Sequence, residues 1–128
     1  MGKSYIISSS SKSFINDSIK DIFIGLDLQK DSNSEDIYYL KCLEDKNSIG
    51  IEQVKQLINW SNSKPFHSKN KAGIILEAEK LTEQAQNAML KLLEEPSKSN
   101  NYILTTSNYR DLITTITSRC QLILDSKI

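Results

Sequence analysis

The sequence predicts an α/β fold in which one sheet of five parallel strands is covered by helices on both faces, giving three layers. Apolar and amphipathic segments alternate along the 128 residues, beginning and ending with a strand, and such alternation is typical of parallel strands joined by right-handed crossovers. The run 72–76 is almost continuously apolar, as expected of a strand buried on both faces. A chain of this length fits a single domain, which we assign to residues 1–128.

The segment after this apolar run predicts an acidic turn followed by an amphipathic helix. Glu77 and Glu79 follow the strand directly, at the end of the sheet where open α/β folds bind their ligands. Thr82 is a good N-cap for the helix, and Pro96 ends it. The apolar residues in between recur at helical spacing and form one stripe: Leu81, Ala85, Ala88, Met89, Leu92 and Leu93.

The other elements follow from the same two periodicities. Strands are predicted at 5–8, 37–43, 101–106 and 121–124. Helices are predicted over 14–26, 48–62 and 112–118, with polar loops over 27–36 and 63–70. Trp60, near the end of the second helix, is expected to pack on the core. His67 is the one histidine, and no carboxylate or serine partner is indicated beside it, so we expect it to face solvent.

Composition narrows the range of functions. With 38% hydrophobic and 25% charged residues, the chain is ordinary globular material. The 16 basic and 16 acidic residues cancel, so charge gives no strong case for binding nucleic acid by itself. Cys42 and Cys120 lie far apart and predict no zinc module, and the sequence shows neither a signal peptide nor an apolar run of about 18 residues. We therefore expect a soluble, cytoplasmic protein without a metal or another cofactor.

The turn after the first strand reads as a degenerate phosphate loop. A loop of the form G-x-x-x-x-G-K-[ST] uses its glycines to bring backbone N–H groups onto the phosphates, while Lys contacts β/γ oxygens and Ser/Thr holds magnesium. Lys12 and Ser13 match the end of that motif, but the residues before them are serines, including Ser10 and Ser11, and the loop is shorter. The start of a helix still attracts anions, so the sequence allows weak phosphate binding but predicts against productive ATP binding.

Two stretches of the central unit carry a family resemblance. Residues 76–82 read Leu-Glu-Ala-Glu-Lys-Leu-Thr, and residues 93–96 read Leu-Glu-Glu-Pro. They resemble the Walker B region of bacterial DNA polymerase III clamp-loader subunits, the delta prime and gamma/tau family, whose core is an AAA+ domain of the P-loop NTPase fold. The family's Asp, which holds the magnesium's water shell, is Leu76 here, while Glu77 matches its catalytic Glu. With the phosphate loop also degenerate, the resemblance implies a member that does not hydrolyse ATP, in which Glu77 and Glu79 serve an interface or have no role.

Residues 103–120 resemble the sensor 1 strand and the Ser-Arg-Cys motif of the same family. By its spacing, Ser107 falls at the sensor 1 position, with Thr106 before it. Arg119 matches the arginine that, in the family, enters the neighbouring subunit's ATP site as an arginine finger and stabilises charge on the γ-phosphate. That role in trans needs no phosphate loop in the subunit that donates the arginine. The alternative role for Arg119 is a local ion pair at a strand edge.

The resemblance is close from about residue 48 onwards and weak before it. It implies an ATP-inactive, delta-prime-like subunit or fragment of the clamp loader, which acts in DNA replication when the sliding clamp is loaded onto primed DNA. Its partners would be the gamma/tau and delta subunits, and it would be no enzyme alone, although its holoenzyme is a DNA-directed DNA polymerase. The family's lid and collar domains have no counterpart within 1–128. Two alternatives stay open: a minimal ATPase of gamma/tau type that uses Lys12, Ser13 and Glu77, and a non-catalytic interaction module.

Overall fold

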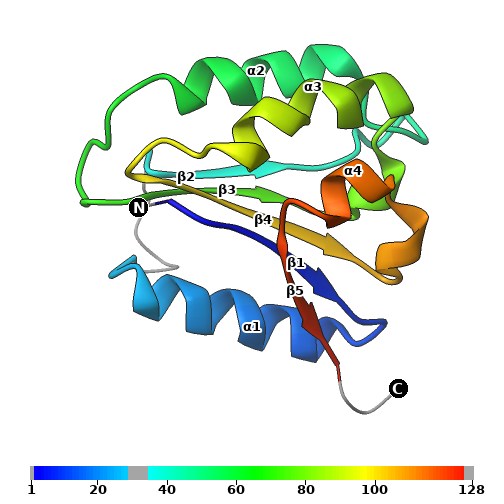
Figure 1. Cartoon of the computed structure of the whole chain (residues 1–128), viewed down its shortest axis with the longest axis horizontal. Helices are drawn as coiled ribbons and strands as arrows, with labels where there is room; N and C mark the ends of the chain where they lie inside the picture. The colour runs from blue at the N-terminus through cyan, green and yellow to red at the C-terminus, as the bar shows by residue number, and fades with distance from the viewer. Residues whose placement is uncertain (1, 29–34, 126–128) are drawn as a thin grey trace.

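Five parallel strands form the centre of the molecule (Figure 1). The computed structural model describes residues 2–28 and 35–125, so residues 29–34 of the predicted loop lie outside it. The strands are β1 (Ser4–Ser8), β2 (Ile37–Leu40), β3 (Lys71–Ile75), β4 (Asn100–Thr106) and β5 (Gln121–Leu124). They lie in the order β2-β3-β4-β1-β5, and every neighbouring pair is parallel. The predicted five-stranded parallel sheet is therefore confirmed.

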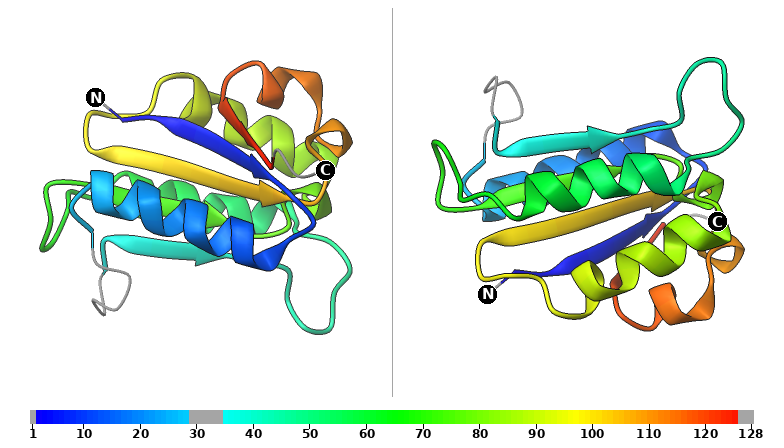
Figure 2. Two further views of the ribbon diagram at one scale, coloured as in Figure 1. Left: turned by 90° about the horizontal axis from the view of Figure 1, so that it is seen from below. Right: turned by 90° about the horizontal axis from the view of Figure 1, so that it is seen from above.

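Helices cover both faces of this sheet, as predicted. One face carries α1 (Lys12–Gly25), and the other carries α2 (Ile51–Ser61), α3 (Glu83–Glu94) and the short α4 (Thr114–Thr117), as Figures 1 and 2 show. Two short 3-10 turns, η1 (Ala78–Lys80) and η2 (Tyr109–Asp111), follow β3 and β4. The predicted cap of α3 is confirmed, because Oγ1 of Thr82 accepts the N–H of Ala85 at 3.1 Å.

Side chains of the strands alternate between two apolar cores. In β1, Ile6 contributes to the core under α2, α3 and α4, and Ile7 contributes to the core under α1; both are fully buried. The sheet and α2 approach each other closely at Gly73, where a Cβ would lie 3.2 Å from a carbon of Leu57 and 3.2 Å from a ring carbon of Tyr102. Glycine therefore permits this tight packing of helix on strand.

Two element boundaries differ from the prediction by three residues, and the others by no more than two. β2 ends at Leu40 rather than at residue 43, since its pairing with β3 stops there. The second helix begins at Ile51 rather than at residue 48, because Ile49 forms a parallel bridge to Leu81 and is fully buried. Apolar residues at the ends of both predicted elements are thus used in connecting segments instead.

A buried polar cluster at the amino ends of β2 and β3 was not predicted. Lys71 is fully buried, and its Nζ donates to the carbonyl oxygens of Trp60 and Ser63 at the end of α2. Asp36 is also fully buried, and its carboxylate accepts three consecutive backbone N–H groups at 2.6 to 2.8 Å, those of Phe66, His67 and Ser68. The cluster fixes the loop between α2 and β3.

Two predictions concern aromatic residues near this cluster, Trp60 and His67. The first is confirmed, and the second is confirmed only in part. Trp60 packs against the core under α2, as predicted, and its Nε1 donates to the carbonyl oxygen of Glu35 at 2.9 Å. For His67, exposure is confirmed but the absence of a carboxylate partner is wrong, because its Nε2 lies 3.9 Å from Oε1 of Glu35. That partner comes from another loop, which spacing along the sequence does not reveal.

Candidate functional site

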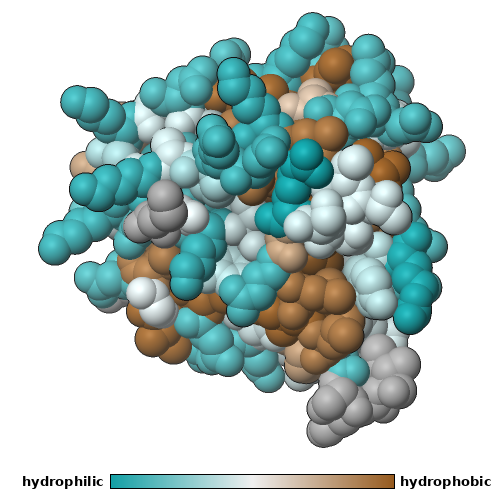
Figure 3. Space-filling view, viewed as in Figure 1, coloured by the Kyte–Doolittle hydropathy of each residue, from teal (hydrophilic) through white to brown (hydrophobic). Residues whose placement is uncertain are grey.

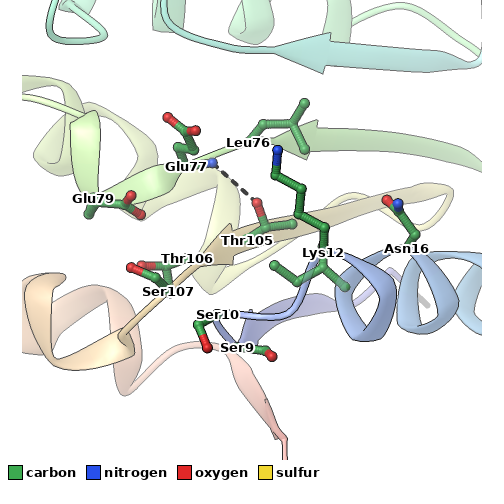
Figure 4. A pocket seen from close by; sticks show the side chains of 11 residues that line it. Ser9, Ser10, Lys12, Asn16, Leu76, Glu77, Glu79, Thr105, Thr106 and Ser107 are labelled. Atoms are coloured by element: carbon green, nitrogen blue, oxygen red, sulfur yellow. Dashed lines mark hydrogen bonds between the residues drawn. The ribbon is translucent and has the colours of Figure 1, made fainter.

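The carboxyl ends of β1, β3 and β4 meet at a cavity of about 460 Å³ beside the start of α1 (Figure 4). Open α/β folds bind their ligands at this edge of the sheet. The lining combines polar and charged groups with an apolar base: Ser9, Ser10, Lys12, Ile15, Asn16, Leu76, Glu77, Glu79, Thr105, Thr106 and Ser107. The structure thus brings together residues from the predicted phosphate loop, the Walker B-like turn and the sensor 1-like strand end.

The turn between β1 and α1 has only three residues, Ser9, Ser10 and Ser11. Ser11 is the N-cap of α1. Ser9 is buried, and its Oγ donates to Oδ2 of Asp125 at 2.8 Å while accepting the N–H of Ser11 at 2.9 Å. A phosphate-binding loop presents a concave row of free N–H donors, whereas this turn is short and bonded to its own side chains.

Two side chains of α1 line the cavity. Lys12 is the first residue of the helix, and its side chain extends across the cavity toward the end of β3 (Figure 4). Asn16, one turn further along, lines the same wall. Ser13, predicted as part of the phosphate loop, is exposed and is not among the lining residues. The Lys-Ser pair is therefore divided, with only the lysine at the cavity.

The acidic turn after β3 has a constrained geometry. Glu77 adopts the left-handed conformation (φ 54°, ψ 58°), and its backbone N–H donates to Oγ1 of Thr105 at 3.2 Å. Its carboxylate lies 2.7 Å from Nζ of Lys80, and this hydrogen bond raises the pKa of that lysine. Oε1 of Glu79 is buried without a hydrogen-bond partner among the described residues. Glu77, which the sequence predicts at the position of the family's catalytic Glu, is thus engaged in a local ion pair.

The end of β4 supplies the sensor 1-like residues. Thr106 is buried, and its Oγ1 accepts the N–H of Asn108 at 3.3 Å and lies 3.2 Å from the carbonyl oxygen of the same residue. Ser107 is exposed at the cavity. Thr105 was missed, although it connects β4 to the acidic turn; the run of small polar residues at this strand end was the signal that could have identified it.

Arg119 lies outside this cavity, between α4 and β5. Its Nη1 donates to the carbonyl oxygen of Thr115 at 2.8 Å, and its Nε lies 3.5 Å from Oε2 of Glu94 as an ion pair without a hydrogen bond. The side chain of Arg119 is 29% exposed. Next to it, burial raises the pKa of the Cys120 thiol to about 12, so this thiol stays protonated at neutral pH. The Arg119 side chain is therefore partly exposed, with its Nε buried, and its guanidinium is held by contacts within its own chain.

The charges around the cavity are mixed, with Lys12 facing the acidic turn of Glu77 and Glu79. Among residues 2–28 and 35–125, no group of three His, Cys, Asp or Glu side chains is arranged to hold a metal ion. In the same part of the chain, none of the helices combines the length and the apolar character that a membrane crossing requires. The cavity offers a cation and several hydroxyl groups, but the β1–α1 turn beside it lacks the glycines of an ATP site.

Comparison with known proteins identifies the relatives of this fold. Residues 8–126 match the protein family described as DNA polymerase III, delta subunit. The chain belongs to this family. The DNA polymerase III subunit delta' of Yersinia pestis is 39% identical over 88 residues, which cover 69% of this chain and 26% of that protein. The subunit delta' of Escherichia coli is 32% identical over 98 residues, 77% of this chain and 29% of that protein.

Relatives of the gamma/tau type are similar as well. The DNA polymerase III subunit gamma/tau of Mycoplasma genitalium is 31% identical over 108 residues, 84% of this chain and 18% of that protein. The delta-prime and gamma/tau resemblance drawn from the sequence motifs is therefore confirmed. The chain spans less than a third of the length of these DNA polymerase III relatives.

Solved structures agree on the fold. The crystal structure of a DNA polymerase III gamma subunit-related protein from Thermotoga maritima has a TM-score of 0.83 at 25% identity, covering 98% of this chain and 41% of that one. The DNA clamp loader delta protein of Bacillus subtilis has a TM-score of 0.73 at 8% identity, covering 98% and 38%. The predicted AAA+-type, P-loop NTPase-like core of clamp-loader proteins is thus confirmed.

Proposed function

We propose that this chain is the AAA+ core of an ATP-inactive, delta-prime-like subunit of the DNA polymerase III clamp loader. In this role it is not an enzyme. It presents Arg119 in trans to the ATP site of an adjacent gamma/tau subunit while the sliding clamp is loaded onto primed DNA in the cytoplasm. Its direct partners are the gamma/tau and delta subunits, and it needs no cofactor of its own.

Three features support the absence of ATP hydrolysis. The β1–α1 turn has three serines and no glycine, which is too short to surround a triphosphate. Leu76 stands where the family's magnesium-associated Asp would be. The carboxylate of Glu77 pairs with Nζ of Lys80 at 2.7 Å, so it is engaged in an ion pair rather than orienting a water molecule. Each change alone is tolerable, but together they affect phosphate binding, metal binding and water activation.

The exposure and contacts of Arg119 support its proposed role as an arginine finger in trans. The Arg119 side chain is 29% exposed, lies outside the chain's own cavity, and contacts two groups of the same molecule, Glu94 and the carbonyl oxygen of Thr115. An arginine that acts in trans must be both reachable and held in a fixed direction, and its planar fork suits phosphate oxygens. The sequence match to the family's Ser-Arg-Cys motif supports the same assignment.

Substitution of Arg119 tests the proposal. In a clamp loader reconstituted with gamma/tau, delta, sliding clamp and primed DNA, Arg119→Ala is expected to lower ATP turnover by at least about tenfold, because arginine fingers make large contributions to phosphoryl transfer. Arg119→Lys is expected to restore little, since lysine lacks the planar fork. Arg110→Ala is the matched control, because Arg110 is the other arginine and is exposed. Unchanged turnover in Arg119→Ala would reject the finger role.

The lysine in the cavity favours a second candidate, a minimal ATPase of gamma/tau type. Lys12 reaches across the cavity toward the acidic turn, as a nucleotide-binding lysine would. Calorimetry with ATP and magnesium separates the two functions, since micromolar binding would favour the ATPase. The third candidate function is a non-catalytic interaction module. If the chain is such a module, the protein is not expected to co-purify with polymerase subunits.

A further inference from the structure

Gln86 is a polar residue on the buried side of α3. It is 5% exposed and lies on that helix with Ala85 and Met89, which are fully buried. A buried amide is costly unless its polar ends are hydrogen-bonded. Nε2 of Gln86 donates to the carbonyl oxygen of Leu81 at 3.2 Å, and Oε1 accepts the N–H of Ile113 at 3.0 Å. The amide therefore links α3 to the residue that directly precedes α4.

A continuous series of hydrogen bonds leads from Gln86 to Arg119. Ile113, which donates to Gln86, is the N-cap residue of α4. Its carbonyl oxygen accepts the N–H of Ile116 at 3.0 Å, and the carbonyl oxygen of Ile116 accepts the N–H of Arg119 at 3.0 Å. The guanidinium then donates from Nη1 to the carbonyl oxygen of Thr115 at 2.8 Å. The stretch from the start of α4 to the arginine thus forms one bonded unit, and Gln86 holds its first residue.

This stretch needs support from the rest of the chain. α4 has only four residues, and a single helical turn is unstable in water by itself. The buried side chains of Leu112 and Ile116 attach the stretch to the core, but the hydrophobic effect has no direction. Figure 3 shows mostly hydrophilic or neutral side chains over α3 and α4, so the outer side of these helices faces solvent. A directed bond such as that from Gln86 therefore fixes the register of the stretch on α3.

α3 also contacts the stretch at its other end. Oε2 of Glu94 lies 3.5 Å from Nε of Arg119. Glu94 is eight positions beyond Gln86 on the same helix, a rise of about 12 Å. Two contacts at this separation set both the position and the direction of the stretch relative to α3, whereas a single contact would let it pivot.

We propose that Gln86 is a positioning residue for Arg119: its amide holds the start of α4 on α3 and so sets where the guanidinium lies toward the ATP site of the adjacent subunit. This inference rests on the proposed function. Gln86 touches no nucleotide and acts only through the stretch that carries Arg119. Because a displacement of about 1 Å can remove much of a group's effect on a reaction, loss of the Gln86 bond is expected to lower turnover.

The experiment measures steady-state ATP turnover in a clamp loader reconstituted from full-length subunits with sliding clamp and primed DNA. Gln86→Met keeps the length of the side chain but removes both bonds. It is expected to lower kcat by about fivefold, less than Arg119→Ala does, while KM for ATP stays unchanged. Gln84→Met is the matched control, because Gln84 lies on the same helix and is exposed, and its kcat is expected to equal that of the unchanged protein. Should Gln86→Met fail to fold, Gln86→Leu replaces it.

Gln86→Glu separates positioning from a role in stability alone. Glutamate keeps an oxygen that accepts the N–H of Ile113, but burial of its charge is expected to lower stability more than methionine does. Since the bond to Ile113 is the one that positions Arg119, Gln86→Glu is expected to retain more turnover than Gln86→Met although it is less stable. Turnover that instead follows the stability of the two variants, measured by urea denaturation, would overturn the positioning role.

The double variant Gln86→Met with Arg119→Ala tests whether the two residues act as a unit. Without the arginine there is nothing left to position, so methionine is expected to lower turnover no further in that background. An equal loss in both backgrounds, or unchanged kcat in Gln86→Met alone, overturns the positioning role and leaves the finger role of Arg119 intact. Unchanged turnover in Arg119→Ala overturns the proposed function and the positioning role together.

Discussion

Nε of Arg119 lies 3.5 Å from Oε2 of Glu94, which joins the end of α3 to the segment between α4 and β5. The two residues belong to the two motifs of the family resemblance, Leu-Glu-Glu-Pro and Ser-Arg-Cys, so motifs far apart in the sequence form one contact in space. The pair is partly exposed, with side-chain exposures of 29% and 58%, and such pairs contribute little to stability. Orientation of the guanidinium is therefore the role that this contact supports.

Glu94→Gln tests that role. The variant keeps the shape of the side chain but removes its charge, so Arg119 keeps only its hydrogen bond to the carbonyl oxygen of Thr115. We expect ATP turnover of the reconstituted clamp loader to fall several-fold, less than in Arg119→Ala, while the free energy of unfolding changes by less than about 1 kcal/mol. Urea denaturation and steady-state ATPase assays measure the two effects. Glu95→Gln is the neighbouring control, and equal turnover in both variants would contradict an orienting role.

Ser9→Ala tests what keeps the β1–α1 turn closed. Ser9 is 1% exposed, and its hydroxyl links Asp125 to the N–H of Ser11. Alanine leaves that N–H without its acceptor, so we expect the free energy of unfolding to fall by about 1–3 kcal/mol. Ser10→Ala serves as the comparison, since Ser10 is exposed and its loss is expected to change stability by less than about 0.5 kcal/mol. Similar urea midpoints for both variants would show that the Ser9 contacts do not stabilise the turn.

Asp36→Asn is expected to change the response to acid. Burial tends to raise the pKa of Asp36, but the N–H groups of Phe66, His67 and Ser68 and the nearby His67 ring outweigh it and hold the pKa below its ordinary 3.8. A carboxylate whose folded pKa is lowered stabilises the protein above its unfolded pKa, and this contribution disappears as pH falls below 3.8 through the folded pKa.

The asparagine variant lacks this titration. We expect it to be less stable than the unchanged protein by about 2–3 kcal/mol at pH 7, because an amide replaces a hydrogen-bonded buried carboxylate. The difference is expected to shrink as pH falls from 4 toward 2, measured by urea denaturation at each pH. Parallel pH profiles for the two proteins would be inconsistent with a lowered pKa of Asp36.

The sequence predicted the sheet, both helical layers and most of the cavity, because these depend on local periodicity and on motifs at strand ends. Lys12, Glu77 and Ser107 all lie at the cavity, as the parallel arrangement requires. What it missed depends on contacts between distant segments. The bond between Ser9 and Asp125 joins residues 116 positions apart, and no spacing within a single element indicates it.

The same limit applies to buried charges. Lys71 directly precedes the predicted strand 72–76, yet it is fully buried, with its Nζ bonded to a carbonyl oxygen at the end of α2. A burial pattern taken from periodicity assigns lysine to the surface by default. The burial of Lys71 can be explained only from the tertiary structure, in which carbonyl oxygens at the end of α2 and just after it accept hydrogen bonds from Nζ.

Lys71→Met therefore gives the most demanding test of the described core. Nζ of Lys71 donates to the carbonyl oxygens of Trp60 and Ser63 and to Oγ of Ser63, and it lies 4.0 Å over the Trp60 ring. Methionine has a similar length but no donor, so the carbonyl oxygen of Ser63 loses its bond to Nζ and that of Trp60 keeps only its bonds from Ser63, at an expected cost of about 2–4 kcal/mol.

The pH dependence gives this variant a second signature. Burial lowers the pKa of Lys71, and the charge of Asp36 opposes this only in part. A base with a lowered folded pKa binds fewer protons than in the unfolded chain, so stability rises with pH between the folded pKa and 10.5. As pH rises toward 10.5, we expect urea denaturation to show the unchanged protein gaining stability relative to Lys71→Met. The Cys120 thiol, whose pKa is raised to about 12, lowers the stability of both proteins above pH 9 and cancels in this comparison. Lys55→Met, at an exposed position of α2, should follow the unchanged protein, and an equal divergence there would assign the effect to other groups.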